Sequence, residues 1–233
     1  MVVLLAFMLI ARVVTPADFG IAAAGMIVVE LGVVLAQFGV KFALIQKMEL
    51  TADDRATGLA LTVAFSVMTA GGIWLLRAPL EGLFAIEGLA PVLGALTIVV
   101  LVSGAAGSFE AMLYRDLQFQ KVSLIDFAGT FFGFGVVATL MALAGAGVWS
   151  IVAGHIVTWT LRSACYVLLA PRPPMGRFTS RSARALLYFG AGFSMGRLAN
   201  YVANNADRAI VGRVLGAEAL GFYERALQLM LAP

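Results

Sequence analysis

The chain has little of what enzymes and nucleic-acid-binding proteins need. Its 233 residues include one cysteine, Cys165, and one histidine, His155, which excludes an internal disulfide framework and a cysteine-based zinc cluster. Charged residues make up only 12% of the chain, and its 16 lysines and arginines are spread between apolar runs rather than gathered in a basic patch. The sequence therefore predicts no catalytic residue, no metal site, no cofactor and no nucleic-acid partner.

What the chain has instead is long apolar runs. Hydrophobic residues make up 61% of it, against roughly 45–50% in soluble domains. A helix needs about 20 apolar residues to cross a bilayer core about 30 Å thick. The complete runs are 20–40, 56–76, 89–109, 127–146, 148–170 and 185–210, and shorter ones occupy 1–14 and 220–233. We predict an all-α, polytopic membrane helix bundle of about eight transmembrane helices, with the first and last truncated.

One pattern occurs twice. Residues 11–20 and 212–221 align without a gap, each with a small residue, an arginine and two aliphatic residues before an acid-bearing turn that ends in glycine. So long a period indicates a duplicated multi-helix unit, as in many transporters. We expect a six-helix lobe at 1–170, a basic cytoplasmic linker at 171–184 and the start of a second, related lobe at 185–233. About 10–20 residues are then expected upstream, and several helices downstream.

The basic residues predict an orientation in the membrane. Cytoplasmic loops of membrane proteins carry an excess of lysine and arginine. Most of these residues fall in the second, fourth and sixth loops, which we therefore expect to be cytoplasmic. They are Lys41, Lys47, Arg55, Arg115, Lys121, Arg172, Arg177, Arg181 and Arg184, whereas Arg12, Arg77, Arg208 and Arg213 fall at the opposite side.

Polar side chains form three stripes at helical spacing. Charge at membrane depth costs a few kcal/mol and usually faces a bundle interior or a water-filled path. The richest stripe is Arg197, Asn200, Asn204 and Asp207. The other two are His155, Trp159, Arg162 and Tyr166, and Glu30, Gln37 and Lys41. We expect Arg197 to line a cavity, with Asp207 as an internal partner or a loop anchor.

Each stripe also has a structural interpretation. Polar groups in membrane bundles often serve as interhelical hydrogen bonds worth about 0.6 kcal/mol each. Glu30, Gln37 and His155 fit that role, and Arg162 fits a side chain that extends to the membrane surface. The segment 192–196 matches G-x-S-x-G, the pattern of a serine nucleophile, but it lies inside a predicted helix. Its glycines, like Gly129 and Gly133, equally fit a close-packing helix face.

Seven motifs, in order along the chain, resemble the polysaccharide-transporter branch of the multidrug/oligosaccharidyl-lipid/polysaccharide exporter superfamily. They are TPADFG at 15–20, ALIQ at 43–46, LTADD at 50–54, RDLQF at 115–119, GVWS at 147–150, NADRAIVGRVLG at 205–216 and ALGFYERA at 219–226. Together they cover nearly the whole chain. Members of that branch are flippases of the Wzx type, with 12 to 14 helices in two lobes, which move undecaprenyl-pyrophosphate-linked oligosaccharides across the bacterial inner membrane.

The resemblance implies a central cavity between the lobes, alternating access, and cations that hold the pyrophosphate. Arg197 is the best candidate here, because a guanidinium presents a planar fork to phosphate oxygens. Arg12 and Arg225 are weaker candidates. Asn200, Asn204 and Glu30 complete the expected substrate-binding set, with Asp207 and Glu30 as a possible ion pair or coupling pair. The implied partners are a lipid-linked oligosaccharide, the lipid bilayer and other polysaccharide assembly proteins.

Three alternatives stay open at this point. A cation-coupled drug exporter of the same superfamily would share the fold and use buried carboxylates, for which Glu30, Glu110, Asp126 and Asp207 are the candidates near membrane depth. A flippase for peptidoglycan precursors would share both fold and substrate chemistry. A membrane assembly subunit that transports nothing would tolerate loss of Arg197.

Overall fold

The computed structural model describes residues 2–170 and 176–230, and all its regular elements in those residues are helical. In chain order they are α1 (Val2–Val13), α2 (Pro16–Gln37), α3 (Val40–Gln46), α4 (Ala52–Phe84), α5 (Leu89–Arg115), α6 (Phe119–Thr130), the π-helical η1 (Phe131–Ala138), α7 (Thr139–Leu143), α8 (Val148–Leu169) and α9 (Ser180–Met230). Part of the expected linker, 171–175, and the chain ends at 1 and 231–233 lie outside the described residues.

Five segments of the described chain have the length and apolar composition to cross a membrane. They are Pro16–Gln37, Ala52–Phe84, Leu89–Arg115, Phe119–Leu143 and Val148–Leu169. The predicted all-α membrane bundle is thus confirmed. The seventh and eighth predicted helices lie within α9, which is 51 residues long and has a break at Gly216, where φ is 84° and ψ is −179°. The polar side chains of α9 make it less apolar than those five segments.

Capping residues explain where several helices begin and end. Thr15 caps α2, accepting a hydrogen bond from the Asp18 backbone N–H at 3.2 Å, and Pro16 follows in the first turn. Thr51 and Asp54 form a complete capping box at the start of α4. Phe38 and Gly39, both with positive φ, separate α2 from α3.

Hydropathy placed several helix ends too close to the middle of the helix. The predicted helix 56–76 continues as α4 to Phe84 and includes Arg77, whose guanidinium stacks 3.8 Å from the Trp74 ring. The predicted helix 127–146 begins at Phe119 and so contains Asp126. Sliding hydropathy detects the apolar centre of a helix, whereas capping groups and paired charges let the helix continue beyond it.

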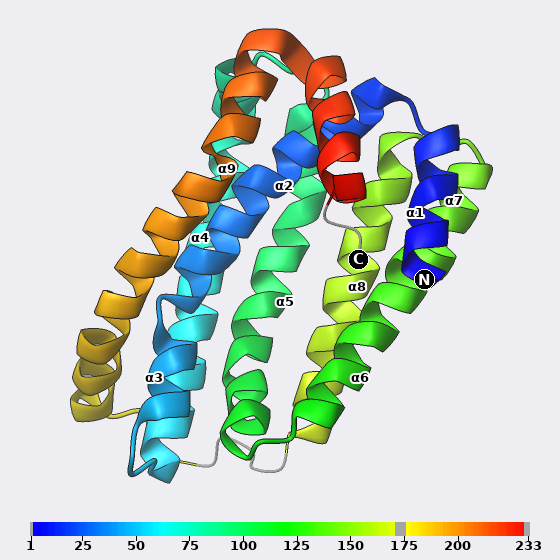
Figure 1. The fold of residues 1–233 in the computed structure, drawn as a ribbon. Coiled ribbons are helices and arrows are strands. Elements are labelled where there is room, and N and C mark those ends of the chain that lie inside the picture. Colours follow the sequence, from blue (N-terminus) through cyan, green and yellow to red (C-terminus); the bar gives the residue numbers. More distant parts are fainter. Residues whose placement is uncertain (1, 171–175, 231–233) are drawn as a thin grey trace.

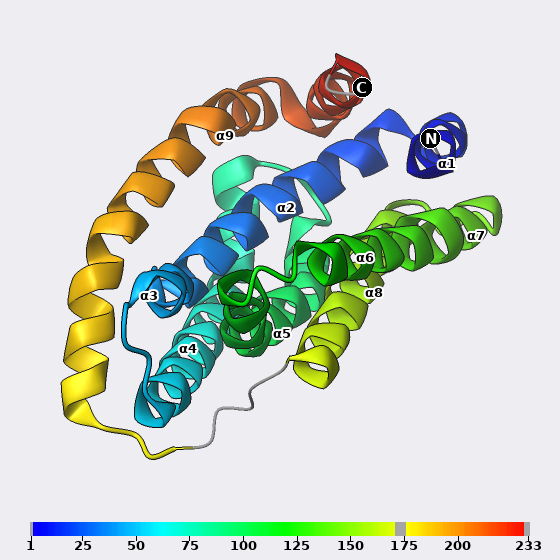
Figure 2. The ribbon, with the colours of Figure 1, turned by 60° about the horizontal axis from the view of Figure 1, so that its bottom comes forward.

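α2 and α5 form the centre of the bundle. Their spanning segments are 67% and 61% buried, against 22% for Ala52–Phe84 and for Phe119–Leu143, which leave most of their residues on the outside of the bundle. The first part of α9 curves along the outside of α2, α3 and α4 (Figures 1 and 2). At the bend after this part the chain reverses, and the last part of α9 runs back toward α1 and the start of α2.

The helix ends agree with the predicted orientation. The α5–α6 turn, α3, the end of α8 and the start of α9 lie at one end of the bundle, the lower end in Figure 1. The α1–α2 and α4–α5 turns and the bend of α9 lie at the other end. The basic loops thus share one side. Lys41 is the exception, because it belongs to α3 and is turned into the bundle.

The two copies of the repeated pattern contact each other reciprocally. A Cβ on Gly20 would overlap the backbone of Ala217, and a Cβ on Gly221 would overlap the backbone of Pro16. These four positions correspond pairwise in the alignment of 11–20 with 212–221. Such an exchange of equivalent contacts is the mark of a two-fold relationship between copies. Both glycines are needed because any side chain would push the two turns apart.

Candidate functional site

Arg197 lies half-buried on the inner side of α9. Its Nη1 donates a hydrogen bond to Gln37 Oε1 at 3.2 Å, and its guanidinium carbon is 5.3 Å from the centroid of the Phe42 ring. Among the described residues no carboxylate lies within ion-pair distance of it. The guanidinium therefore keeps donors free for a further partner.

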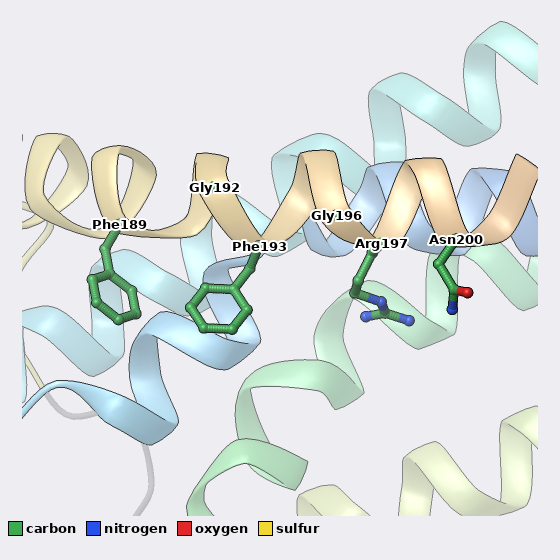
Figure 3. Close-up of a pocket in the computed structure, with 6 residues that line it drawn as sticks. All are labelled: Phe189, Gly192, Phe193, Gly196, Arg197 and Asn200. Atoms are coloured by element: carbon green, nitrogen blue, oxygen red, sulfur yellow. The ribbon is translucent and has the colours of Figure 1, made fainter.

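One side of Arg197 borders an open groove along α9, with a volume of about 440 Å³. The groove is lined by Phe189, Gly192, Phe193, Gly196, Arg197 and Asn200. The side chains of Phe189, Phe193, Arg197 and Asn200 point to the same side of the helix (Figure 3). A Cβ on Gly192 or Gly196 would meet nothing within 4 Å, so these glycines keep the groove wide rather than pack against described residues.

The other side of Arg197 borders a more enclosed, polar cavity of about 170 Å³ between α2, α3, α5, α8 and α9. Its polar lining residues are Gln37, Lys41, Ser103, Glu110, Trp159, Arg162, Ser163, Tyr166 and Arg197. The hydroxyl of Ser163 is buried and has no hydrogen-bond partner in the described chain. A cavity of this size and polarity has room for several waters, each of which occupies about 30 Å³ in the liquid.

Two ion pairs hold the cavity wall together. Lys41 Nζ lies 2.6 Å from Glu110 Oε2, and Arg162 Nη2 lies 2.6 Å from Asp126 Oδ1. Tyr166 also donates its hydroxyl to Asp126, at 2.7 Å. These pairs neutralise two of the three cations that line the cavity. The third, Arg197, has no carboxylate partner in the described part of the chain and donates to the neutral amide of Gln37.

This charge imbalance gives the site its chemistry. A buried cation without a countercharge is costly, and the cost falls when an anion binds to it. A guanidinium with free donors binds two phosphate or carboxylate oxygens at once. The groove and the cavity together thus form a site suited to an anionic group next to apolar and aromatic surface.

The two asparagines predicted beside Arg197 extend the same helix face. Asn200 lines the groove, and Asn204, one turn further on, donates hydrogen bonds to the Asn200 side-chain and backbone oxygens, both at 2.7 Å. Both side chains are exposed in the described chain. Glu30 is also exposed, on α2, and lies within the electrostatic range of Arg208 and Glu224.

Arg12 and Arg225 lie away from this groove. Arg12 is exposed near the end of α1. Arg225 Nη2 donates to the Val14 carbonyl oxygen at 2.6 Å, and its guanidinium lies over the Phe19 ring at 4.6 Å. Arg225 thus fastens the last part of α9 to the turn between α1 and α2.

Asp207 belongs to a clamp across the bend of α9. It accepts a hydrogen bond from the Tyr223 hydroxyl at 2.5 Å, and the next residue, Arg208, pairs with Glu224 at 3.0 Å. Asp207 and Arg208 precede Gly216 and their partners follow it. The motif residues at 205–216 and 219–226 therefore include the groups that hold the two parts of α9 together.

The other candidates for chemistry have structural partners. Ser194, in the G-x-S-x-G match, donates to the Gly190 carbonyl within its own helix at 3.0 Å. The His155 ring packs edge-on against Phe134, with 4.8 Å between ring centroids. In the described part of the chain no three histidine, cysteine or acidic residues are grouped so that they could hold a metal ion.

Sequence reasoning missed the ion pairs of the cavity. Lys41 stands among the predicted loop cations and in the stripe with Glu30 and Gln37, and Glu110 and Asp126 are named as carboxylates near membrane depth, but the sequence pairs none of them. Their common signal is isolated charge at the edge of an apolar run, on segments that follow one another. That pattern shows that a charge needs a partner, but the choice of partner depends on how each helix is rotated.

The fold and this polar interior define a multi-pass membrane protein with an anion-compatible site between its helices. The model of one family, described as polysaccharide biosynthesis protein, matches residues 9–233. The chain belongs to that family, as its motifs predicted. With its five spanning segments, this membership places it among multi-pass proteins of the inner membrane.

Several characterised proteins are similar to the chain. It is 24% identical over 231 residues to the lipopolysaccharide biosynthesis protein WzxC of Escherichia coli K12, covering 96% of this chain and 46% of WzxC. It is 23% identical over 218 residues to the succinoglycan biosynthesis transport protein ExoT of Rhizobium meliloti, covering 94% and 44%. For the teichuronic acid biosynthesis protein TuaB of Bacillus subtilis the identity is 25% over 202 residues, covering 86% and 42%.

The chain thus spans less than half the length of these relatives. The aligned part includes α9, so Arg197 lies in the region that the family shares. No solved structure matches the chain.

Proposed function

We propose that the chain is part of a flippase that moves an undecaprenyl-pyrophosphate-linked oligosaccharide across the bacterial inner membrane, for the assembly of a surface polysaccharide. The observation that carries the proposal is Arg197, a half-buried guanidinium without a carboxylate partner in the described chain, between an open groove and a polar cavity. The names of the relatives, which include a transport protein, support the same function.

In this proposal the pyrophosphate binds to Arg197, and Asn200 and Asn204 donate hydrogen bonds to the phosphate or the first sugar. The exposed aromatic rings of Phe189 and Phe193 border the apolar prenyl chain. The protein performs no bond chemistry, since moving an intact lipid across the bilayer requires only alternate exposure of one site to the two sides.

We further propose a two-lobe arrangement, with residues 1–170 as one lobe, 171–184 as the linker and 185–233 as the start of a second. The reciprocal contact of Gly20 and Gly221 with the opposite turns supports it. The site would then face the space between the lobes. We propose Glu30 on α2 and Asp207 on α9 as the coupling pair. The charges of Arg208 and Glu224 act on Glu30, and these two residues form an ion pair with each other.

The test is polysaccharide export from cells that carry the full-length protein with Arg197→Ala. Export is expected to fall to background while the amount of protein in the membrane stays unchanged, because the substitution removes the cation but no ion pair. Arg213→Ala is the matched control, since Arg213 is exposed on the same helix. Normal export by Arg197→Ala would overturn the proposal and favour an assembly subunit that does not transport.

A further inference from the structure

The cavity beside Arg197 contains more charge than is needed to hold helices together. Three cations and one carboxylate line it, with a second carboxylate, Asp126, on Arg162. A bundle in lipid can pack with uncharged hydrogen bonds alone, and charged groups at this depth are costly. The arrangement calls for an explanation beyond packing.

Glu110 is the carboxylate that connects the ion pairs to Arg197. It pairs with Lys41 at 2.6 Å, and among the described groups it is the one whose negative charge acts on the Arg197 guanidinium. Asp126 is occupied by Arg162 and Tyr166 on the far wall. Glu110 therefore has two cations in reach, one bound and one close by.

The Lys41 ammonium group holds Glu110 in an ion pair inside the cavity that Arg197 also lines. Its Nζ contacts Glu110 on one side and lies 5.3 Å from the centroid of the Tyr114 ring on the other. Both Lys41 and Glu110 are only slightly exposed, at 14% and 13% of their side chains, so water screens their charges weakly. If Lys41 lost its charge, the Glu110 carboxylate would be left unneutralised in the cavity that Arg197 also lines.

We propose that the Lys41–Glu110 pair sets the affinity of Arg197 for anions, so that Glu110 is a positioning residue for the substrate phosphate. Lys41 raises this affinity by neutralising Glu110, and Glu110 limits it, so that the bound anion can leave again. This inference rests on the proposed role of Arg197 as the phosphate contact. It adds Lys41 and Glu110 as the groups that set how tightly Arg197 holds the phosphate.

The proposal predicts effects of opposite sign from the two members of one ion pair. Glu110→Gln leaves two uncompensated cations facing the cavity and binds an anion tighter. Lys41→Met leaves the Glu110 carboxylate free to compete with the anion for Arg197. This variant therefore binds the anion more weakly. We expect a change in dissociation constant on the order of tenfold in each direction. The double variant K41M/E110Q removes both charges and returns close to the wild-type value.

A purely structural pair behaves differently. Breaking a buried ion pair from either end leaves one charge unpaired and destabilises the protein. Both single variants would then bind the anion more weakly or unchanged, in parallel with their loss of stability. Lys47 and Asp54 provide the matched control, because they form an ion pair of the same 2.6 Å length away from the cavity. K47M and D54N should lower stability without shifting anion affinity in opposite directions.

The experiment measures binding of farnesyl diphosphate, a short prenyl diphosphate, to the full-length protein in lipid nanodiscs by isothermal titration calorimetry. The variants are R197Q, E110Q, K41M, K41M/E110Q and the two controls, with thermal unfolding recorded for each. If K41M does not fold, Lys41→Gln replaces it, since its amide keeps a hydrogen bond to Glu110 without the charge.

Tighter binding by E110Q together with weaker binding by the Lys41 variant supports the proposal. A change of the same sign in both, or none in either, overturns it. If R197Q binds like the wild type, the proposed function itself fails; if R197Q loses binding while the pair shows no opposite effects, only this inference fails.

Discussion

Arg197 differs from the other arginines of the bundle in what surrounds it. Arg115 donates to four backbone carbonyls at the end of α3 and the residues after it, and Arg162 and Arg208 each pair with a carboxylate. Arg225 fastens two turns together. These side chains hold parts of the fold in place. Arg197, like Arg225, has one neutral hydrogen-bond partner, but it borders an open groove on one side and a polar cavity on the other. That setting distinguishes the proposed binding cation from the arginines that hold parts of the fold together.

The contrast between Arg225 and Arg12 can be tested on stability. Arg225→Met removes the hydrogen bond to the Val14 carbonyl and is expected to lower the free energy of unfolding by about 1.5–3 kcal/mol, the range for a bond to a charged donor. Arg12→Ala, at an exposed position, should change it by less than about 0.5 kcal/mol. Denaturant unfolding in detergent measures both. Equal losses, or none for Arg225→Met, would contradict the role given to Arg225.

At the scale of elements, two glycine pairs of the same spacing have different surroundings. Gly129 and Gly133 face α8 so closely that a Cβ on either would overlap Arg162 or Thr158 atoms, which is the close-packing face that their spacing predicts. Gly192 and Gly196 have the same spacing, but open space surrounds them. Spacing alone cannot distinguish the two cases, because it records which residues share a face and not what that face contacts.

This difference predicts opposite results for the same substitution. Gly133→Ala should destabilise the protein by about 1–3 kcal/mol through overpacking against Thr158. Gly196→Ala should be neutral or stabilise it by up to about 1 kcal/mol, since alanine favours the helix. Thermal unfolding measures both. Gly196→Leu should then fold normally but fill the groove and reduce polysaccharide export; full export by that variant would show that the substrate does not use the groove.

For the whole molecule, the sequence was most informative about properties that do not depend on how distant helices pack against each other. Apolar runs and loop charges predicted the membrane class and a common side for the basic loops, and the order of seven motifs predicted the family. The spacing of Arg197, Asn200 and Asn204 placed them correctly on one face. The pairing of Lys41 with Glu110, and of Arg208 with Glu224, could not be predicted, because it depends on the rotation and crossing of helices far apart in sequence.

The repeated turns also show what the sequence can predict and what only the structure reveals. The alignment of 11–20 with 212–221 indicated duplication, and the structure adds that the two copies touch through Gly20 and Gly221. That contact places α2 beside α9, with Gln37 against Arg197 nearer the opposite end. The repeat thus brings together the two helices on which the proposed site depends.

The most direct test of the central claim is a flipping assay with the purified full-length protein in proteoliposomes. A fluorescent polyprenyl-pyrophosphate-linked sugar is incorporated, and the fraction exposed on each leaflet is followed by quenching from outside. The wild-type protein should redistribute the label between leaflets, and Arg197→Ala, inserted in equal amount, should leave it at the rate of protein-free vesicles. Equal redistribution by Arg197→Ala and the wild type would contradict the account.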